Sequence, residues 1–315
     1  MSLFPPTPAH WYAIANPTAG NGFVRKKWPV LQQRIAQALP VGAFALSEHK
    51  GHAIELAQRA VEKGYRRILA IGGDGTNHEV ANGILMQQAA PSAEVTYALL
   101  PVGTGNDWIK THGLPKDMDE ALAVIRAGNT RFQDAGLIRY YKGGQPQQRY
   151  FVNVAGLAYD GYIGKKSEER RYATRNKLFY LALVVSCLFE YKLQRAIVEG
   201  NGRRIEDYFY TINLGICRYS GGGMQLVPHA VPDGGQFAVT AAGRISRLGV
   251  LLNTYRFYNG SVGSHPKVET FYAEKLSVRA SDGEPPTLLE ADGEFLGETP
   301  ASFSIIKKAL CIIAP

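Results

Sequence analysis

Residues 71–83, IGGDGTNHEVANG, decide the fold of this chain. An apolar run, 68–71, stops at two glycines, and a segment with apolar residues at helical spacing follows the turn. This pattern predicts a strand, a glycine turn and a helix start. Such a turn brings backbone N–H groups and a helix N-terminus to an anion. The carboxylate of Asp74, in the middle of the turn, adds an option for chemistry or metal chelation.

Two more glycine turns follow predicted strands. NPTAG occupies residues 16–20 and PVGTGND occupies residues 101–107. Strands predicted at 11–16, 42–47, 67–71 and 95–100 alternate with helices at 26–39 (with Pro29 in the first turn), 54–62 and 119–127. This alternation predicts an α/β unit with a mainly parallel sheet. Because ligands bind at the carboxyl edge of such sheets, the three turns predict a nucleotide site.

The pattern changes near residue 130, where short strand-like segments punctuated by glycine take over. We expect a second, β-rich domain of the antiparallel or sandwich type. The fold class is therefore α/β plus all-β, with a Rossmann-like nucleotide domain at 1–134 and an antiparallel β-sandwich at 135–315. The expected strands are 131–138, 149–153, 195–199, 208–214, 236–241, 267–271, 275–279 and 301–306, with one long helix within 167–193 and another near 246–258.

The composition is that of a globular protein with anionic partners. The chain has 315 residues, a formal net charge of +8 and three cysteines, which we expect to be buried thiols in a reducing cytosol. No signal-peptide pattern opens the sequence. The longest apolar run, 178–189, has 12 residues, against the roughly 20 that a spanning helix needs. We expect a cytoplasmic protein with at most peripheral contact with the inner face of the membrane.

Two nucleotide signatures are absent. The phosphate loop GxxxxGK[ST] does not occur, and the dinucleotide fingerprint GxGxxG fails because His78 stands where its last glycine would be. Phosphoryl transfer does not require either signature. It needs correct positioning of the two substrates, a divalent cation and often a carboxylate base. Asp74 could simply cap the helix that follows it, although the flanking glycines and threonine favour chemistry. By itself, the pair Asp292–Gly293 is typical of a β-turn.

The motifs GGDGTNHEVANGIL (72–85) and PVGTGNDW (101–108) resemble the diacylglycerol kinase catalytic-domain family. NPTAG (16–20), FVNVAGLAYDG (151–161), GGGMQLVPHAVPDGGQF (221–237) and DGEFLGETPASF (292–303) also match it, in the same order. The likeness covers most of the chain and is nearest to bacterial soluble lipid kinases. It implies an ATP-binding α/β domain, a β-sandwich on the lipid side, and dependence on Mg²⁺.

The resemblance also implies roles for individual residues. Asp74 would position the Mg²⁺–phosphate group and share in base catalysis, and Glu294 would accept the proton of the lipid hydroxyl. Asp134 and Asp292 would help to place Mg²⁺. Asp233 lies one position before the expected ligand of a second, structural metal. The residues implied in ATP binding are Asn16, Ser47, Gly73, Asp74, Gly75, Thr76, Asn77, His78, Glu79 and Thr104.

The acceptor is left open by the sequence. His78 replaces an asparagine of the family and resembles the sphingosine-kinase branch, so both a diacylglycerol-like and a long-chain-base lipid are candidates. Segment 177–191, apolar on almost every face, is either core or a wall for an acyl chain. The preceding basic run is either a solvated helix face or a contact with anionic lipid headgroups. Its residues are Lys165, Lys166, Arg170, Arg171, Arg175 and Lys177.

Two rival functions remain at this point. One is an NAD-kinase-like kinase of a soluble acceptor, since NAD kinases share a GGDGT turn. The other is a non-catalytic regulator that binds lipid or nucleotide. No nucleic-acid module accompanies the basic residues, so nucleic acid is not an expected partner. The expected partner is a lipid substrate at a membrane surface, and a homodimer stays an option.

Overall fold

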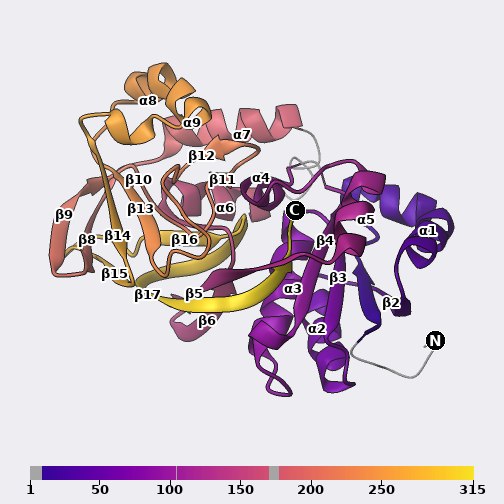
Figure 1. Cartoon of the computed structure of the whole chain (residues 1–315). Coiled ribbons are helices and arrows are strands. Elements are labelled where there is room, and N and C mark those ends of the chain that lie inside the picture. Colours follow the sequence, from indigo (N-terminus) through magenta and orange to yellow (C-terminus); the bar gives the residue numbers. More distant parts are fainter. Residues whose placement is uncertain (1–8, 104, 170–176) are drawn as a thin grey trace. The chain divides into compact units, whose positions relative to one another are not determined.

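The computed structural model describes residues 9–103, 105–169 and 177–315 (Figure 1). Thr104, and the basic residues Arg170, Arg171 and Arg175, lie outside the described residues. Two compact units make up the chain: Met1–Ala135 together with Lys307–Pro315, and Gly136–Ile306. The last residues thus belong to the first unit, whereas the sequence division had placed all of 135–315 in the second. The physical reason is strand β17 (Glu294–Ile313), which runs from the second unit into the first.

The first unit is built on parallel strands. Its sheet has the order β4-β3-β1-β2, and Cys311 and Ile312 of β17 pair in parallel with the outer side of β4. The elements are β1 (Trp11–Ala15), α1 (Ala19–Ala38), β2 (Val41–Leu46), α2 (His52–Glu62), β3 (Arg67–Gly72), α3 (Asp74–Met86), the 3₁₀ helix η1 (Ser92–Glu94), β4 (Thr96–Pro101), α4 (Asp107–His112) and α5 (Met118–Ala127).

Helices cover both faces of this parallel sheet (Figure 1). Alternate strand residues such as Ala13, Leu69 and Leu100 share a buried cluster with apolar residues of α1 and α5. The intervening residues, such as Ile68 and Ala70, are equally buried and point to the other face. Burial on both faces is typical of parallel sheets and explains their near-continuous apolar sequence.

Helix α1 differs from its predicted form. Residues 20–22 have positive φ and non-helical geometry, so the regular helix follows this kink. Pro29 consequently lies inside the helix and not in its first turn. Val24, Leu31 and Ile35, spaced at helical intervals, bury the inner side of α1. The free energy gained by packing this face exceeds the cost of the backbone hydrogen bond that the helix loses at proline.

The second unit is antiparallel, as predicted. Its strands follow the order β14-β13-β10-β7-β16-β17, β15 pairs with β17 and β8, and the hairpins are β8–β9, β5–β6 and β11–β12. The strands are β5 (Thr130–Lys142, which begins in the first unit), β6 (Gln145–Phe151), β7 (Val154–Ala158), β8 (Gln194–Gly200), β9 (Arg203–Phe209), β10 (Thr211–Gly215), β11 (Tyr219–Ser220), β12 (Met224–Gln225), β13 (Phe237–Ala242), β14 (Val268–Ala273), β15 (Lys275–Ala280) and β16 (Leu288–Ala291).

Several elements of this unit depart from the sequence prediction. The predicted strand 208–214 is divided at Tyr210, because β9 pairs with β8 whereas β10 pairs with β7 and β13. Helix α7 (Lys177–Glu190) lies within the range of the expected long helix, and helix α6 (Tyr159–Glu169), which was not predicted, precedes it. The others are α8 (Arg247–Asn253), α9 (Tyr255–Asn259) and the 3₁₀ helix η3 (Val262–Ser264). Within the described part of the chain, no helix has the length and apolar character to cross a membrane.

Candidate active site

Asn16 connects the turn after β1 to the motif that opened the sequence. Its backbone N–H donates to the Ile71 carbonyl at 3.0 Å, and its side-chain Oδ1 accepts from the Thr18 N–H at 2.9 Å. Its Nδ2 donates to the Thr76 hydroxyl at 3.2 Å. Ser47, directly after β2, donates its N–H to the Ala15 carbonyl at 2.9 Å. The ends of β1, β2 and β3 are therefore held together at the carboxyl edge of the sheet.

The turns after β3 and β4 meet backbone to backbone. The Val102 N–H donates to the Gly72 carbonyl at 2.8 Å. A Cβ atom on Gly103 would lie 2.6 Å from the Cα of Gly73, and a Cβ on Gly73 would lie 3.1 Å from the Cα of Gly103. Any side chain at either position would separate the two turns. The glycines thus leave an edge of bare backbone at the start of α3, the arrangement that binds phosphate groups in other proteins.

Asp74 is the first residue of α3, and Gly73 is the N-cap. The Asp74 carboxylate does not cap its own helix, the structural alternative considered from sequence. Its Oδ1 accepts instead from the backbone N–H groups of Asp107, at 2.9 Å, and Trp108, at 3.3 Å, at the start of α4. Burial raises the pKa of Asp74 and the neighbouring Asp107 raises it further, while backbone hydrogen bonds oppose the shift. The carboxylate therefore locks the two glycine turns to each other.

Asn106 belongs to the same edge and was missed from sequence. It has φ 52°, its side chain is buried, and its Nδ2 donates to the Gly103 carbonyl at 2.9 Å. Its Oδ1 is buried and has no hydrogen-bond partner among the described residues. Left-handed backbone combined with an orphaned acceptor is a recognised mark of functional sites. Its position in the motif PVGTGND could have identified it, but Thr104 was the one residue of that motif predicted to bind ATP.

The later residues of the predicted ATP-binding run point into the protein. Thr76, Asn77 and His78 are at most 4% exposed. The Tyr97 hydroxyl donates to Asn77 Oδ1 at 2.6 Å, and His78 is fully buried beside Asn82, whose amide donates to the His78 carbonyl at 2.9 Å. These side chains hold α3 against its neighbours. The exposed or half-exposed positions of the run are Gly73, Asp74, Gly75 and Glu79.

Glu79 also has a structural task. Its two carboxylate oxygens accept from the backbone N–H groups of Gly51, at 2.9 Å, and Ala53, at 3.1 Å, where α2 begins. A helix start has unsatisfied N–H groups and a partial positive charge, so a carboxylate stabilises it. Since His78 is buried in α3 as well, its difference from the family asparagine does not identify the acceptor through direct contact.

The motif Asp292–Glu294 forms the turn between β16 and β17 in the second unit. Asp292 and Gly293 both have positive φ, 52° and 84°, as two-residue hairpin turns require. Asp292 is buried, and its Oδ2 and Oδ1 accept from the backbone N–H groups of Val152, at 3.0 Å, and Asn153, at 2.9 Å. The turn is thereby fastened to the link between β6 and β7, and the partly exposed Glu294 opens β17.

Two carboxylates next to this turn, Glu290 and Asp160, were not identified from the sequence. Glu290 is buried, and its Oε2 accepts from the Gly293 N–H at 2.8 Å. A Cβ on Gly156 would lie 2.7 Å from both Glu290 Oε1 and the Cβ of Asp160, so glycine at this position gives the two acids room. The Thr211 hydroxyl donates to Asp160 Oδ2.

Both acids of this pair hold their protons more tightly than usual. Burial raises the pKa of Asp160 to about 6. Burial, followed by the negative charges of Asp160 and Asp292, raises the pKa of Glu290 well above its ordinary value. Perturbed acids of this kind cluster at functional sites. The available sequence signals were Tyr159–Asp160–Gly161 in the matched motif and a glutamate two residues before Asp292.

The predicted metal ligands do not form a cage. Asp134 is buried, and its Oδ1 accepts from the Lys308 N–H at 2.7 Å, which fastens β5 to β17 within the first unit. Asp233 is exposed, and both oxygens of Asp292 bind backbone. Within residues 9–103, 105–169 and 177–315, no group of three or more His, Cys, Asp or Glu side chains is arranged to hold a metal ion. Mg²⁺ commonly binds through one or two carboxylates and the substrate phosphates, and Asp74 fits that role.

Comparisons with known proteins agree on one family. Residues 10–138 match the diacylglycerol kinase catalytic domain, and residues 153–314 match the YegS C-terminal NAD kinase beta sandwich-like domain. A diacylglycerol kinase of Staphylococcus epidermidis is 30% identical over 312 residues, covering 96% of this chain and 91% of that protein. One of Staphylococcus carnosus is 27% identical over 312 residues, covering 96% and 94%.

A solved structure shares the fold. The crystal structure of a diacylglycerol kinase from Bacillus anthracis superposes with a TM-score of 0.71 at 19% identity, covering 98% of this chain and 97% of that one. The two family matches cover residues 10–138 and 153–314, and the parallel first unit and antiparallel second unit agree with them. The similarity therefore covers nearly the whole chain. The chain therefore belongs to the diacylglycerol kinase catalytic-domain family, a family of lipid kinases.

Proposed function

We propose that this protein transfers the γ-phosphoryl group of ATP to the hydroxyl of a diacylglycerol-like or long-chain-base lipid, with Mg²⁺. The observation that carries the proposal is the carboxyl edge of the parallel sheet. There Asp74 ties together two glycine turns whose backbones meet at Gly73 and Gly103. Glycine backbone next to a helix start accommodates a chain of phosphates, and Asp74 supplies a carboxylate beside it.

On the nucleotide side, the protein's task is positioning. The N-terminus of α3, a helix of 13 residues, begins at Asp74 and favours negative charge. Asn16 holds the first turn in register with this helix through Thr76. The orphaned Oδ1 of Asn106 offers a further polar contact at the same edge. Bound Mg²⁺ would neutralise charge on the phosphate oxygens.

On the acceptor side, Glu294 takes the proton. As the lipid oxygen attacks the γ-phosphorus, the bond from phosphorus to the bridging oxygen of ADP breaks and the hydroxyl proton passes to the Glu294 carboxylate. The preceding turn is anchored by Asp292 on the β6–β7 link and by Glu290 on the Gly293 N–H. These contacts fix the backbone from which the Glu294 side chain extends, which reduces the free energy needed to position it in the transition state.

The test is transfer of label from γ-labelled ATP with Mg²⁺ to diacylglycerol, to sphingosine and to NAD in parallel. We expect a labelled lipid, and a loss of about 10²-fold or more in kcat for Glu294→Gln, the size of a general-base contribution. Glu298→Gln, four residues along β17, is the matched control and should keep full activity. Labelling of NAD alone would assign the protein to soluble acceptors. A folded preparation that transfers to none of the three would identify a non-catalytic regulator.

A further inference from the structure

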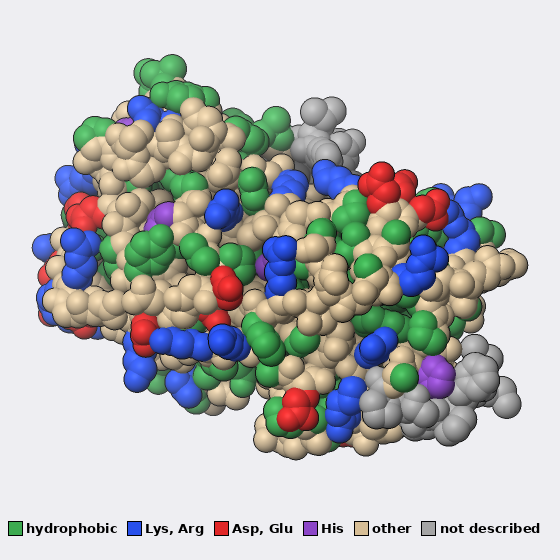
Figure 2. All heavy atoms as spheres, in the orientation of Figure 1, with side chains coloured by type: hydrophobic (Ala, Val, Ile, Leu, Met, Phe, Trp, Pro, Cys, Tyr) green, Lys and Arg blue, Asp and Glu red, His purple; other side chains and the backbone are tan. Residues whose placement is uncertain are grey.

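Helices α8 and α9 present an apolar face to solvent. Their five most exposed apolar residues are Leu248, Leu251, Leu252, Tyr255 and Tyr258. Leu248, Leu251 and Leu252 follow one another at intervals of three and one residues in α8, and Tyr255 and Tyr258 lie three residues apart in α9, so each set lies on one side of its own helix. Leu248 and Leu252 are 65% and 66% exposed. Figure 2 shows hydrophobic side chains gathered over α8 at the top of the molecule.

The opposite side of the two helices is anchored in the second unit. Val250 packs with the buried cluster around Tyr210, and Phe257 packs with the cluster around Val227. The Ser246 hydroxyl caps α8 by accepting from the Gly249 N–H at 3.0 Å. The inner face therefore attaches the helices to the unit, and the outer leucines and tyrosines lie on the side away from these contacts. A helix with that much exposed apolar surface beyond its core contact indicates an interaction site.

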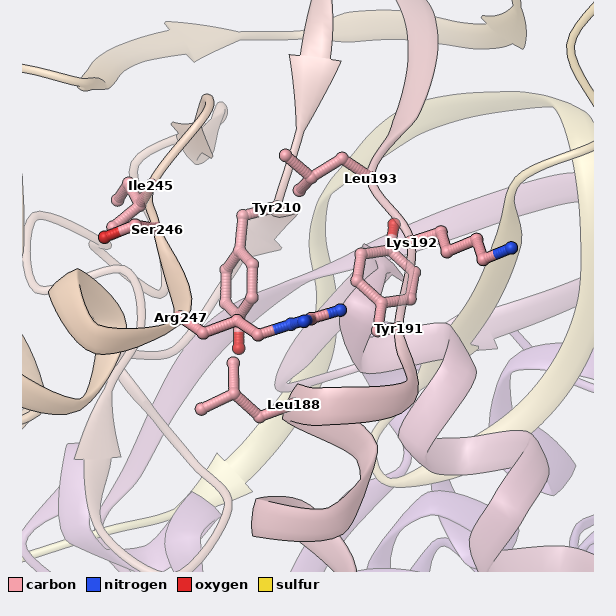
Figure 3. Close-up of a pocket in the computed structure, with 8 residues that line it drawn as sticks. All are labelled: Leu188, Tyr191, Lys192, Leu193, Tyr210, Ile245, Ser246 and Arg247. Atoms are coloured by element: carbon pink, nitrogen blue, oxygen red, sulfur yellow. The ribbon is translucent and has the colours of Figure 1, made fainter.

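The segment that carries this face is rich in basic residues. Residues 234–268 contain no aspartate or glutamate and four basic residues, Arg244, Arg247, Arg256 and Lys267. A hollow of about 460 Å³ lies at the start of α8 and is lined by Arg247 and Lys192 together with apolar and tyrosine side chains. Figure 3 shows Arg247 reaching across this hollow, past Tyr210 and toward Tyr191. No carboxylate of the described residues forms an ion pair with Arg247 or Lys192.

Helix α7 adds a second apolar face in the same unit. Leu181, Val185 and Phe189, at four-residue spacing, are 58%, 38% and 56% exposed. The same helix buries Leu183 and Leu188 on its other side, and Leu188 also lines the hollow beside α8. The sequence had offered core or acyl wall as alternatives for this segment. The described part of α7 instead divides between a buried face and an exposed apolar face.

We propose that the outer face of α8 and α9, with Arg247 and Lys192 beside it, docks on an anionic phospholipid bilayer. Leucines enter the boundary between headgroups and acyl chains, tyrosines lie at headgroup level, and the two cations bind lipid phosphates. The proposal rests on the proposed function in that a lipid kinase must meet its acceptor in such a bilayer. A second copy of the chain is a poorer occupant, because two such faces would bring like charges together.

Vesicle binding without ATP tests this surface independently of catalysis. The probe is sedimentation with vesicles of phosphatidylcholine, with and without phosphatidylglycerol, at low and high salt. We expect binding to the anionic vesicles and a loss of about tenfold or more in affinity for the double variant Leu248→Gln, Leu252→Gln. Arg247→Gln should weaken binding and reduce its dependence on salt. Val30→Gln, at a 56% exposed position of α1 in the first unit, is the matched control and should bind like the parent.

Three outcomes would overturn the proposal. The first is unchanged vesicle binding by the double variant with an unchanged melting temperature. The second is equal loss in the Val30→Gln control. The third is a dimer of the parent chain, seen by light scattering, that the double variant dissociates while vesicle binding stays the same, because the face would then join two copies. If the parent binds vesicles through this face but phosphorylates no lipid, the docking surface stands and the kinase proposal fails.

Discussion

Replacing Asp292 with alanine separates a structural role of this carboxylate from a catalytic one. The buried side chain satisfies two backbone donors, the Val152 N–H at 3.0 Å and the Asn153 N–H at 2.9 Å. The family resemblance makes Asp292 a residue that places Mg²⁺. In the structure, both of its carboxylate oxygens accept hydrogen bonds from the backbone that links β6 and β7. These two roles predict different results in a protein that contains neither nucleotide nor metal.

The expected magnitude follows from the two donors. A buried N–H group left without a partner costs about 1–3 kcal/mol, so Asp292→Ala should lower the free energy of unfolding by about 2–6 kcal/mol. Left-handed backbone at φ 52° adds about 1 kcal/mol for alanine. Asparagine tolerates this backbone and keeps one acceptor, so Asp292→Asn should cost about half as much as alanine.

Hydrogen exchange is the most direct assay. Without ATP and Mg²⁺, the amides of Val152 and Asn153 should exchange faster in Asp292→Ala, and the melting temperature should fall by about 2–4 °C per kcal/mol. Glu294→Gln alters the same turn without removing an acceptor from these amides, so their protection should persist. Full protection in Asp292→Ala, with activity lost, would refute the structural interpretation and favour a role confined to catalysis.

Three further predictions concern stability. Glu79→Ala removes both acceptors at the start of α2 and should cost about 1–2 kcal/mol in urea unfolding; unchanged stability would contradict this. Burial lowers the pKa of His112 to about 4. The neutral side chain therefore contributes about 3 kcal/mol to the free energy of unfolding; this contribution is complete above pH about 6.5 and is lost as the pH falls toward 4. His112→Gln should therefore flatten the acid loss of stability, and an equally steep loss in that variant would disprove the assignment. Burial raises the pKa of Asp160 to about 6, so the stability it confers is present below its ordinary pKa and is lost as the pH rises through about 6. Asp160→Asn should melt higher than the parent at about pH 8 and equally at about pH 4, with a gain of at most about 3 kcal/mol, and a gain of the same size at both values would argue against titration of this acid.

Local patterns predicted the first unit well because its signals are short in sequence. Apolar runs buried on both faces, followed by glycine turns, identify strands β1, β3 and β4 without knowledge of their partners. Strand boundaries in the second unit were predicted less accurately, because they depend on which strands pair with each other. β17 spans 20 residues where only 301–306 was predicted, because it pairs with β16, β15 and β4 in turn.

At the site, the sequence located the turns but not the direction of the side chains. Helical periodicity in α3 could have shown that Asn77, Val80, Ala81 and Ile84 share the buried side. No local pattern could show that Asp74 caps α4, 33 residues later, or that Glu79 caps α2, 28 residues earlier. These contacts are made between elements and exist after the sheet has assembled.

By itself, the sequence determined the order of strands and helices in the first unit, the glycine turns at its carboxyl edge and the family. Each depends on residue spacing over a few turns of chain. The tertiary structure decided what these side chains contact. It fastened Asp292 and Asp134 to backbone, paired Asp160 with Glu290, and buried His78. The reason is physical: the state of a carboxylate depends on burial and on donors that strand pairing brings from distant parts of the chain.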